Sequence, residues 1–286
     1  MPTVHVVTDS NCHIPPALCQ ELGIHVVPLP FTWDGKTYLD MVDMGPQEFY
    51  SRLRKSQTLP KTSGPTPGSF IEVFDRLTHD GNAVLGILVG SQFSSTFTSS
   101  KVARNELSGR TIELIDSDSN GLALGFQVLA AARTIKAGRG MGDAIKAAEV
   151  ARANSGLLFA VSDLNYLRRG GRIAFAENLI GNLLKVVPLM EISGGPIKIL
   201  ERVRSSTRII PRLIELTEKR LSYGRPYQIG VLHADVESTA WELMGRIREH
   251  IQPDELFISE LNPILGVHAG PGAIGLGYCS GINNDD

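Results

Sequence analysis

Short apolar runs alternate with helical patterns along the first half of the chain. Runs rich in β-branched residues and bounded by turn residues predict strands, at 4–8, 24–29, 83–89 and 111–116. Apolar positions at helical spacing fall between them, over 14–23, 46–56 and about 120–137, with a further helix after residue 89. An Asp-Gly pair within 31–40 predicts a hairpin. This alternation predicts a parallel sheet flanked by helices.

The pattern changes near residue 155. A strand at 156–163 and a turn-rich passage precede an amphipathic helix at 175–185, and two strands at 186–204 surround a Gly-Gly-Pro turn. Helices and strands then alternate up to a final strand, over 205–222, 227–234, 236–250, 255–261 and 273–279. We therefore predict an α/β protein of two domains, a parallel-sheet domain at 1–155 and a mixed α/β domain at 156–286.

Composition narrows the class of protein. The 286 residues are 42% apolar, enough for a sizeable core, and the net charge of −2 does not suit nucleic acid or an anionic membrane surface. Three cysteines without a C-x-x-C pair argue against a disulfide framework or a zinc site. The N-terminus lacks a signal-peptide pattern and no apolar run reaches about 18 residues, so we expect a cytoplasmic protein without stable membrane insertion.

Hydroxyl side chains gather in two loops beside predicted helices. Thr62 and Ser63 lie in "KTSGPTPGSF" (61–70), and Ser94 and Ser95 lie in "VGSQFSSTFTSS" (89–100), directly after a buried strand. Free N–H groups and the helix dipole favour an anion at such a place. Simple N-capping by Ser and Thr explains either loop taken alone.

Two further segments carry candidate anion contacts. "VHAGPGAIG" (267–275) combines His268 with Gly270 and other glycines, which allow close approach to the backbone. Arg172 in "RRGGRI" could offer a guanidinium to a carboxylate or phosphate. A packed histidine and a solvated turn are the simpler interpretations of each segment by itself.

Other catalytic patterns are weak. The chain has no G-x-S-x-G elbow, Walker loop or G-x-G-x-x-G. Asp116 and Asp118 in "DSDSNG" fit a turn after a strand better than a metal site. A Ser94–His268–Asp9 triad remains an alternative, and would make the protein a hydrolase or transferase of small acyl substrates.

Several motifs together resemble the DegV family of bacterial fatty-acid-binding proteins. They are "VTDS", "YLDMVDMGPQEFY", "TSGPTPGSF", "SQFSSTFTS", "LNYLRRGGRI", "VVPLMEI…GPIKILERVR" and "HAGPGAIG". The resemblance extends from about residue 4 to 280. It implies two α/β domains with a lipid tunnel between them. It also implies a binding subunit of fatty acid kinase, which presents the acyl carboxylate to a separate ATP-dependent subunit and then carries the acyl phosphate.

The resemblance also assigns residues. The acyl carboxylate would be held by Thr62, Ser94 and His268, with Ser63, Ser95, Arg172 and Gly270 close by. No metal or cofactor is implied, and the bound lipid is the ligand. The chain departs from the family pattern at four positions near these loops, which affects the expected head-group contacts: Gly64, Gln92, Ser95 and Val267.

Two larger sets complete the expectation. The apolar helix at 175–185 is the candidate tunnel lining, with ordinary core packing as the alternative, through Phe175, Leu179, Ile180, Leu183 and Leu184. The resemblance also implies that arginines near residues 202–208 engage the kinase, and these are Arg202, Arg204 and Arg208. Arg204, Arg208 and Arg212 recur at i+4 spacing, which also suits a solvated helix face. A regulatory module for a different small anion is the remaining alternative.

Overall fold

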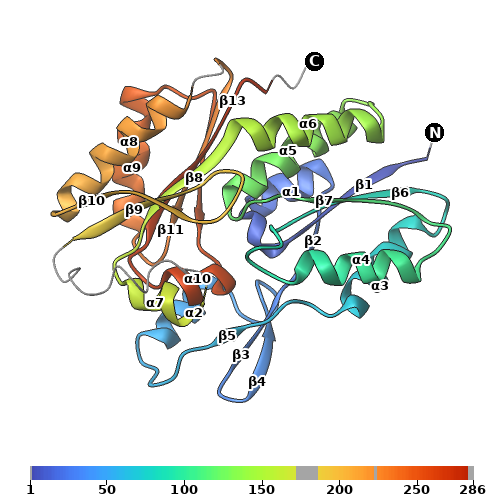
Figure 1. Ribbon diagram of the computed structural model, residues 1–286, viewed down its shortest axis with the longest axis horizontal. Coiled ribbons are helices and arrows are strands. Elements are labelled where there is room, and N and C mark those ends of the chain that lie inside the picture. Colours follow the sequence, from blue (N-terminus) through green and yellow to red (C-terminus); the bar gives the residue numbers. More distant parts are fainter. Residues whose placement is uncertain (1, 172–185, 222–223, 283–286) are drawn as a thin grey trace.

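The computed structural model describes residues 2–171, 186–221 and 224–282 (Figure 1). Four parallel strands form the first sheet, in the order β2-β1-β6-β7. These strands are β1 (Val4–Asp9), β2 (His25–Val27), β6 (Ala83–Leu88) and β7 (Thr111–Asp116). All six residues of β6 are buried, as its continuous apolar run predicts. The predicted parallel sheet is therefore confirmed.

The second sheet has six strands in the order β10-β9-β8-β13-β11-β12. Only β11 and β12 pair in parallel, and the other neighbours are antiparallel. The strands are β8 (Ser155–Ala160), β9 (Val187–Ile192), β10 (Lys198–Val203), β11 (Tyr227–His233), β12 (Glu255–Glu260) and β13 (Ile274–Ser280). The expected mixed α/β half is confirmed, while the division at residue 155 stays a prediction.

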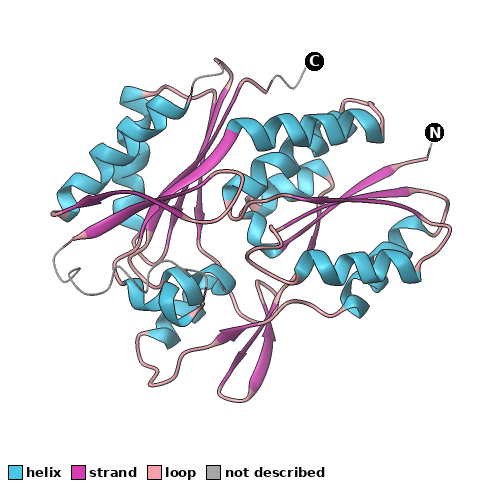
Figure 2. Ribbon diagram, viewed as in Figure 1, coloured by secondary structure: helices cyan, strands magenta, loops and turns pink. Residues whose placement is uncertain are grey.

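Helices cover both sheets (Figure 2). The first sheet packs against α3 (Pro67–Thr78) and α4 (Thr96–Glu106), and the second against α8 (Ile209–Arg220) and α9 (Glu237–His250). Helix α5 (Leu122–Lys136) contacts strands of both sheets. Every residue from Leu122 to Ala132 is buried. A helix that is apolar on all sides is expected to be enclosed in this way.

A small third sheet and several short helices lie between the lower edges of the larger sheets (Figure 1). The sheet, ordered β4-β3-β5, contains β3 (Pro30–Trp33), β4 (Lys36–Leu39) and β5 (Lys61–Thr62), and β3–β4 confirm the predicted hairpin. Helix α10 (Pro263–Ala269) contacts β3, β5, α2 (Pro46–Leu53), α7 (Leu164–Arg169) and the short helix η1 (Ser10–Cys12). It therefore ties the chain's C-terminal part to its N-terminal part.

Some elements differ from the sequence expectation. Helices α6 (Met141–Asn154), α7 and α10 have no counterpart in the predicted elements, and α7 replaces part of the expected turn-rich passage. Helix α1 (Pro16–Leu22) ends at Gly23 in a left-handed conformation, as its glycine suggests. The expected helix at 175–185 lies outside the described residues. No helix in the described part of the chain is long and apolar enough to cross a membrane.

Candidate functional site

A mostly apolar cavity lies at the carboxyl ends of the first sheet's strands, facing the second sheet. Its polar lining residues come from distant parts of the chain and are Asn11, Thr62, Ser63, Ser94, Asn120 and His268. The second sheet contributes apolar side chains, among them Leu157, Phe159, Ile192, Leu232 and Ile274. The carboxyl edge of an open α/β sheet is the usual place for a ligand. The structure therefore brings four of the sequence-predicted residues, Thr62, Ser63, Ser94 and His268, to one cavity.

His268 and Thr62 form the one directly bonded pair among these four in the described structure. The Thr62 Oγ1 and His268 Nε2 atoms are 2.9 Å apart. Thr62 lies in β5, which pairs with β3 at Phe31, and His268 lies in the last turn of α10. Gly170 packs against the imidazole so closely that a Cβ there would collide with His268 Nδ1. The ring is therefore positioned by two segments, β5 and the end of α7.

A buried polar cluster fixes the other end of α10. The Asn262 side chain caps the helix by accepting a hydrogen bond from the Leu265 N–H at 3.0 Å. Its amide Nδ2 donates to Asp40 Oδ2 at 2.5 Å and to the Ser10 carbonyl at 2.7 Å. Burial raises the pKa of Asp40 to about 7. Helix α10 thus depends on a carboxyl group whose charged form is disfavoured by its surroundings.

His13 belongs to the same cluster and is held in its neutral form. Burial lowers its pKa to about 4. The ring accepts a hydrogen bond from the Asn262 N–H at Nε2, 3.3 Å away, so Nδ1 carries the proton and donates to the Asn11 carbonyl at 2.8 Å. This arrangement connects η1 directly to the N-terminus of α10.

Ser94 reaches the cavity from the loop before α4. Its Oγ is 2.7 Å from Thr96 Oγ1 and accepts a hydrogen bond from the Thr96 N–H at 3.3 Å. Ser94 therefore supports the start of α4 from the position before the N-cap, whereas the N-cap residue Ser95 makes no side-chain capping bond, and Ser94 also lines the cavity. A hydroxyl with these contacts keeps a lone pair and rotational freedom for a ligand.

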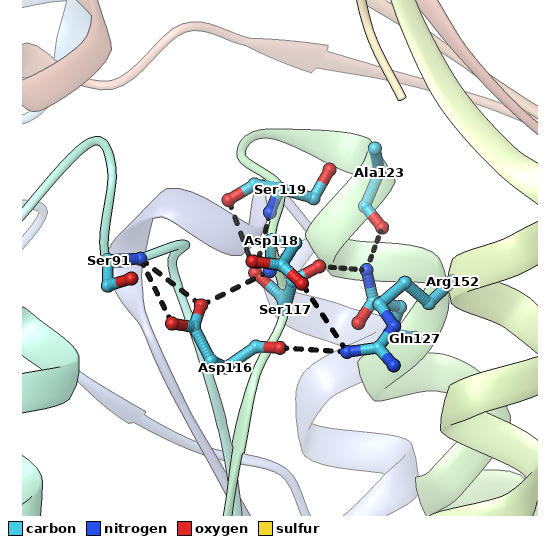
Figure 3. A network of polar contacts seen from close by, with 8 residues as sticks. All are labelled: Ser91, Asp116, Ser117, Asp118, Ser119, Ala123, Gln127 and Arg152. Carbon is cyan, nitrogen blue, oxygen red and sulfur yellow. Dashed lines mark hydrogen bonds and ion pairs between the residues drawn. The ribbon is translucent and has the colours of Figure 1, made fainter. Parts of the chain in front are cut away.

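A hydrogen-bonded network supports the loop before α4, which contains Ser91 and Ser94 (Figure 3). The Asp116 carboxylate accepts hydrogen bonds from the Ser91 N–H at 3.1 and 3.4 Å, and Arg152 Nη1 donates to the Asp116 carbonyl at 3.2 Å. Arg152 also lies 3.7 Å from Asp118 Oδ2. The two carboxylates thus serve turn structure, and no group of three metal-ligating side chains occurs among the described residues.

Two further predicted head-group residues, Ser95 and Gly270, are not among the described residues that line the cavity. Ser95 is exposed, and its hydroxyl occupies the space that a Cβ at Gly64 would take. Two departures from the family pattern therefore lie against each other. Gly270 has a φ of +70° and packs against the Tyr166 ring, where a Cβ would collide. Arg172 and the five predicted lining residues lie outside the described residues, and these are Phe175, Leu179, Ile180, Leu183 and Leu184.

The predicted docking arginines are exposed, but they do not share a helix. Arg202 lies in β10, Arg204 follows that strand, and Arg208 lies in η3 (Ser206–Arg208) before α8 begins at Ile209. The expected helical face through Arg204, Arg208 and Arg212 is therefore wrong. Arg212 pairs with Glu201 through bonds of 2.6 and 2.7 Å and also with Glu215. These hydrogen bonds raise the Arg212 pKa above its usual value.

The sequence reasoning predicted His268 but missed α10 and the apolar cavity residues that this helix carries. Ile264, Leu265 and His268 line the cavity from one side of α10, and Leu261 lines it from just before the helix. A signal was available, because Asn262 followed by a proline combines a preferred N-cap with a preferred first helical residue. Asn11 was also missed, and its position after β1 was the only cue.

The arrangement is suited to holding an anion more than to attacking an acyl group. The Asp9 carboxylate accepts hydrogen bonds from the Asn11 N–H at 3.0 Å and the Val89 N–H at 2.8 Å. Those bonds occupy the Asp9 carboxylate, which the Ser94–His268–Asp9 triad alternative would need as the hydrogen-bond acceptor that orients His268. Burial nevertheless raises the Asp9 pKa to about 6. A hydroxyl and an imidazole in the wall of a mostly apolar cavity can instead orient a carboxylate.

Comparison with known proteins agrees with this geometry. The DegV family model matches residues 3–281. Protein DegV of Bacillus subtilis is 32% identical over 277 residues, covering 96% of this chain and 99% of that protein. A DegV domain-containing protein of Streptomyces coelicolor, SCO2569, is 33% identical over 275 residues, covering 96% of this chain and 97% of that protein.

Solved structures show the same fold. A fatty-acid-binding DegV family protein from Thermus thermophilus superposes with a TM-score of 0.91 at 26% identity, covering 97% of this chain and 99% of that one. DegV of Bacillus subtilis, described as a fatty acid binding protein, gives a TM-score of 0.88 at 31% identity, covering 98% of this chain and all of that one. Sequence and fold together show that this chain belongs to the DegV family.

Proposed function

We propose that the cavity binds a long-chain fatty acid whose carboxylate is held by Thr62, Ser94 and His268. The observation that carries the proposal is the Thr62–His268 pair in the wall of a mostly apolar cavity, with Ser63 and Ser94 also on that wall. The fatty-acid-binding relatives from Thermus thermophilus and Bacillus subtilis support it.

Burial of the tail supplies most of the affinity. Each buried methylene contributes roughly 0.8 kcal/mol, so about 14 methylenes contribute on the order of 11 kcal/mol before the costs of association. The carboxylate needs only a few fixed donors, which set its orientation. A near-neutral protein is therefore sufficient for an anionic lipid.

The same proposal extends to a partner. The head group is presented to a separate fatty acid kinase subunit, which phosphorylates the carboxylate to an acyl phosphate using ATP. The chain itself then acts as a carrier, and the phosphate donor and its magnesium bind to the partner. The exposed Arg202, Arg204 and Arg208 form the proposed docking surface.

Mass spectrometry tests lipid binding directly. The protein is expressed in bacteria, purified without detergent and measured under native and then denaturing conditions. We expect a mass excess that matches about one fatty acid per chain and disappears on denaturation. Protein that stays empty after incubation with a panel of fatty acids would rule out the proposed function.

The partner step has its own test. Lipid-loaded protein is mixed with ATP, magnesium and a fatty acid kinase subunit, and acyl phosphate is trapped with hydroxylamine. Arg204→Glu should reduce trapping severalfold without loss of bound lipid, whereas Arg248→Glu at an exposed position of α9 should not reduce it. Equal trapping by both variants would remove the docking assignment.

A further inference from the structure

Cys12 and Cys19 form a pair of thiols that lies outside the cavity lined by His268. Cys12 lies in η1, and Cys19 lies in the helix that follows, α1. The two side chains are hydrogen-bonded to each other, and Cys19 Sγ also donates to the Ile14 carbonyl at 3.8 Å. Both thiols are free, so the structure shows the reduced form of the pair. Two neighbouring sulfur atoms of this kind are the arrangement from which a disulfide can form.

A second cavity gives a small oxidant access to this pair. The cavity has a volume of about 320 Å³, and both cysteines belong to its lining. Met41 and Val42 line it too, and these residues are 49% and 68% exposed, so the cavity opens at the surface of the protein. The exposed fraction is 7% for Cys19 and 3% for Cys12. A molecule as small as a peroxide can therefore reach the pair, and it meets Cys19 first.

The hydrogen bond makes the two sulfur atoms unequal. It lowers the pKa of Cys19 against the opposing effect of burial, whereas the same bond, together with burial, raises the pKa of Cys12. Because the thiolate is the form that reacts with a peroxide, Cys19 is the expected nucleophile and Cys12 the resolving thiol. Cys279 differs from both, since it is buried in β13, is not among the described residues that line either cavity, and has its pKa raised by burial to about 12.

We propose that Cys12 and Cys19 are a redox modification site, at which a peroxide oxidises the two thiols to an intramolecular disulfide. With hydrogen peroxide, the Cys19 thiolate attacks one oxygen and the O–O bond breaks. Cys19 becomes a sulfenic acid, and the other oxygen leaves as water with the proton that Cys19 gave up. The Cys12 sulfur then attacks the Cys19 sulfur, the S–O bond breaks, and hydroxide leaves with the Cys12 proton as a second water. Two electrons pass from the thiols to the peroxide, and a dithiol reductant reverses the change.

The crosslink would join α1 to a segment that also serves the other cavity. Helix η1 contains Asn11, which lines that cavity. His13, which follows η1, accepts a hydrogen bond from the Asn262 N–H at the start of α10. The modification site is therefore adjacent to the proposed lipid site and separate from it. Its chemistry does not rest on the proposed function, because the thiols line a different cavity.

Peroxide treatment of the reduced protein tests the proposal. Treated samples are denatured, alkylated with iodoacetamide and digested with trypsin, which releases residues 1–36 as one peptide that contains Cys12 and Cys19 but not Cys279. We expect this peptide to escape alkylation and to be lighter than its reduced form by about 2 Da. It should reach this state at least about 10-fold faster than Cys279 is oxidised. A peptide that stays alkylated at both cysteines, or that loses its thiols no faster than Cys279, overturns the inference.

Variants assign the two roles. Cys12→Ser should stop at the sulfenic acid of Cys19, which dimedone traps, whereas Cys19→Ser should leave Cys12 open to alkylation. Cys279→Ser is the matched control and should form the disulfide at the wild-type rate. Oxidation of Cys12 in Cys19→Ser at the wild-type rate would contradict the assigned roles. Wild-type protein unfolded in guanidinium chloride should lose the preference over Cys279, and a preference that survives unfolding would show that the fold does not create the site.

Discussion

Thr62 and Ser94 reach the same cavity by different routes. Ser94 is positioned by residues close to it in the sequence. Its backbone N–H donates to the Gly90 carbonyl in the loop after β6, and its hydroxyl bonds the Thr96 hydroxyl two residues later. Thr62 lies in a two-residue strand, and its hydroxyl bonds His268, which is 206 residues away in the sequence. The Ser94 side is thus local, whereas the Thr62–His268 side depends on the packing of α10. A change on the second side should affect binding more.

Removal of the imidazole should have the largest effect. His268→Ala deletes a hydrogen bond to the carboxylate and leaves Thr62 without its partner. Hydrogen bonds to charged groups are worth about 1.5–3 kcal/mol, so fatty-acid affinity should fall by about 10- to 100-fold in a fluorescence displacement assay. His250→Ala, on the exposed end of α9, provides the control and should bind normally.

Gly170→Ala tests the position of the ring without removing it. The backbone at Gly170 is compatible with alanine, since its φ is −72°. The added methyl would displace His268, so affinity should fall by about 10-fold while the melting temperature changes little. Gly142→Ala adds a methyl into open space and should leave binding unchanged. Equal affinities for the two variants would show that the ring tolerates the shift.

Ser94→Ala should have a smaller effect on binding. One neutral donor is lost, which reduces affinity by about 3- to 10-fold. The loss of the bond to the Thr96 N–H should also lower the free energy of unfolding by about 1 kcal/mol. Ser95→Ala changes a residue outside the cavity and should do neither. An effect of Ser94→Ala as large as that of His268→Ala would contradict the contrast between the two sides.

Asp40→Asn tests the buried support of α10 through pH. The Asp40 pKa in the folded protein is about 7, above its usual value of 3.8, so the folded state binds the extra proton between these values. This carboxyl therefore costs stability increasingly as pH rises through that range, and costs nothing below it. Relative to wild type, Asp40→Asn should gain roughly 2–3 kcal/mol of unfolding free energy between pH 5 and pH 8, since the carboxyl loses its excess proton over about two of these pH units at about 1.4 kcal/mol each. Denaturation curves that shift equally at both pH values would refute this.

Features formed by residues close together in the sequence could be predicted, whereas features formed by distant segments could not. The loop that contains Ser94 was predicted from a buried strand followed by hydroxyls, because strand, loop and helix are contiguous. The first sheet was likewise visible in local patterns such as β6, and the small third sheet in the β3–β4 hairpin. The Thr62–His268 bond and the α10 face could not be derived from spacing, since they arise only when β5 and α10 pack together. The resemblance to a family supplied the residue names, but it could not supply this geometry.

The position of α5 has a consequence for cooperativity. Its residues from Leu122 to Ala132 are covered by strands from both halves of the chain, so neither half can keep its core intact without the other. Heating or denaturant should therefore produce one transition for the described structure, with no stage at which a single half survives. A fragment that ends at residue 155 would expose the apolar side of α5, and aggregation is its expected fate.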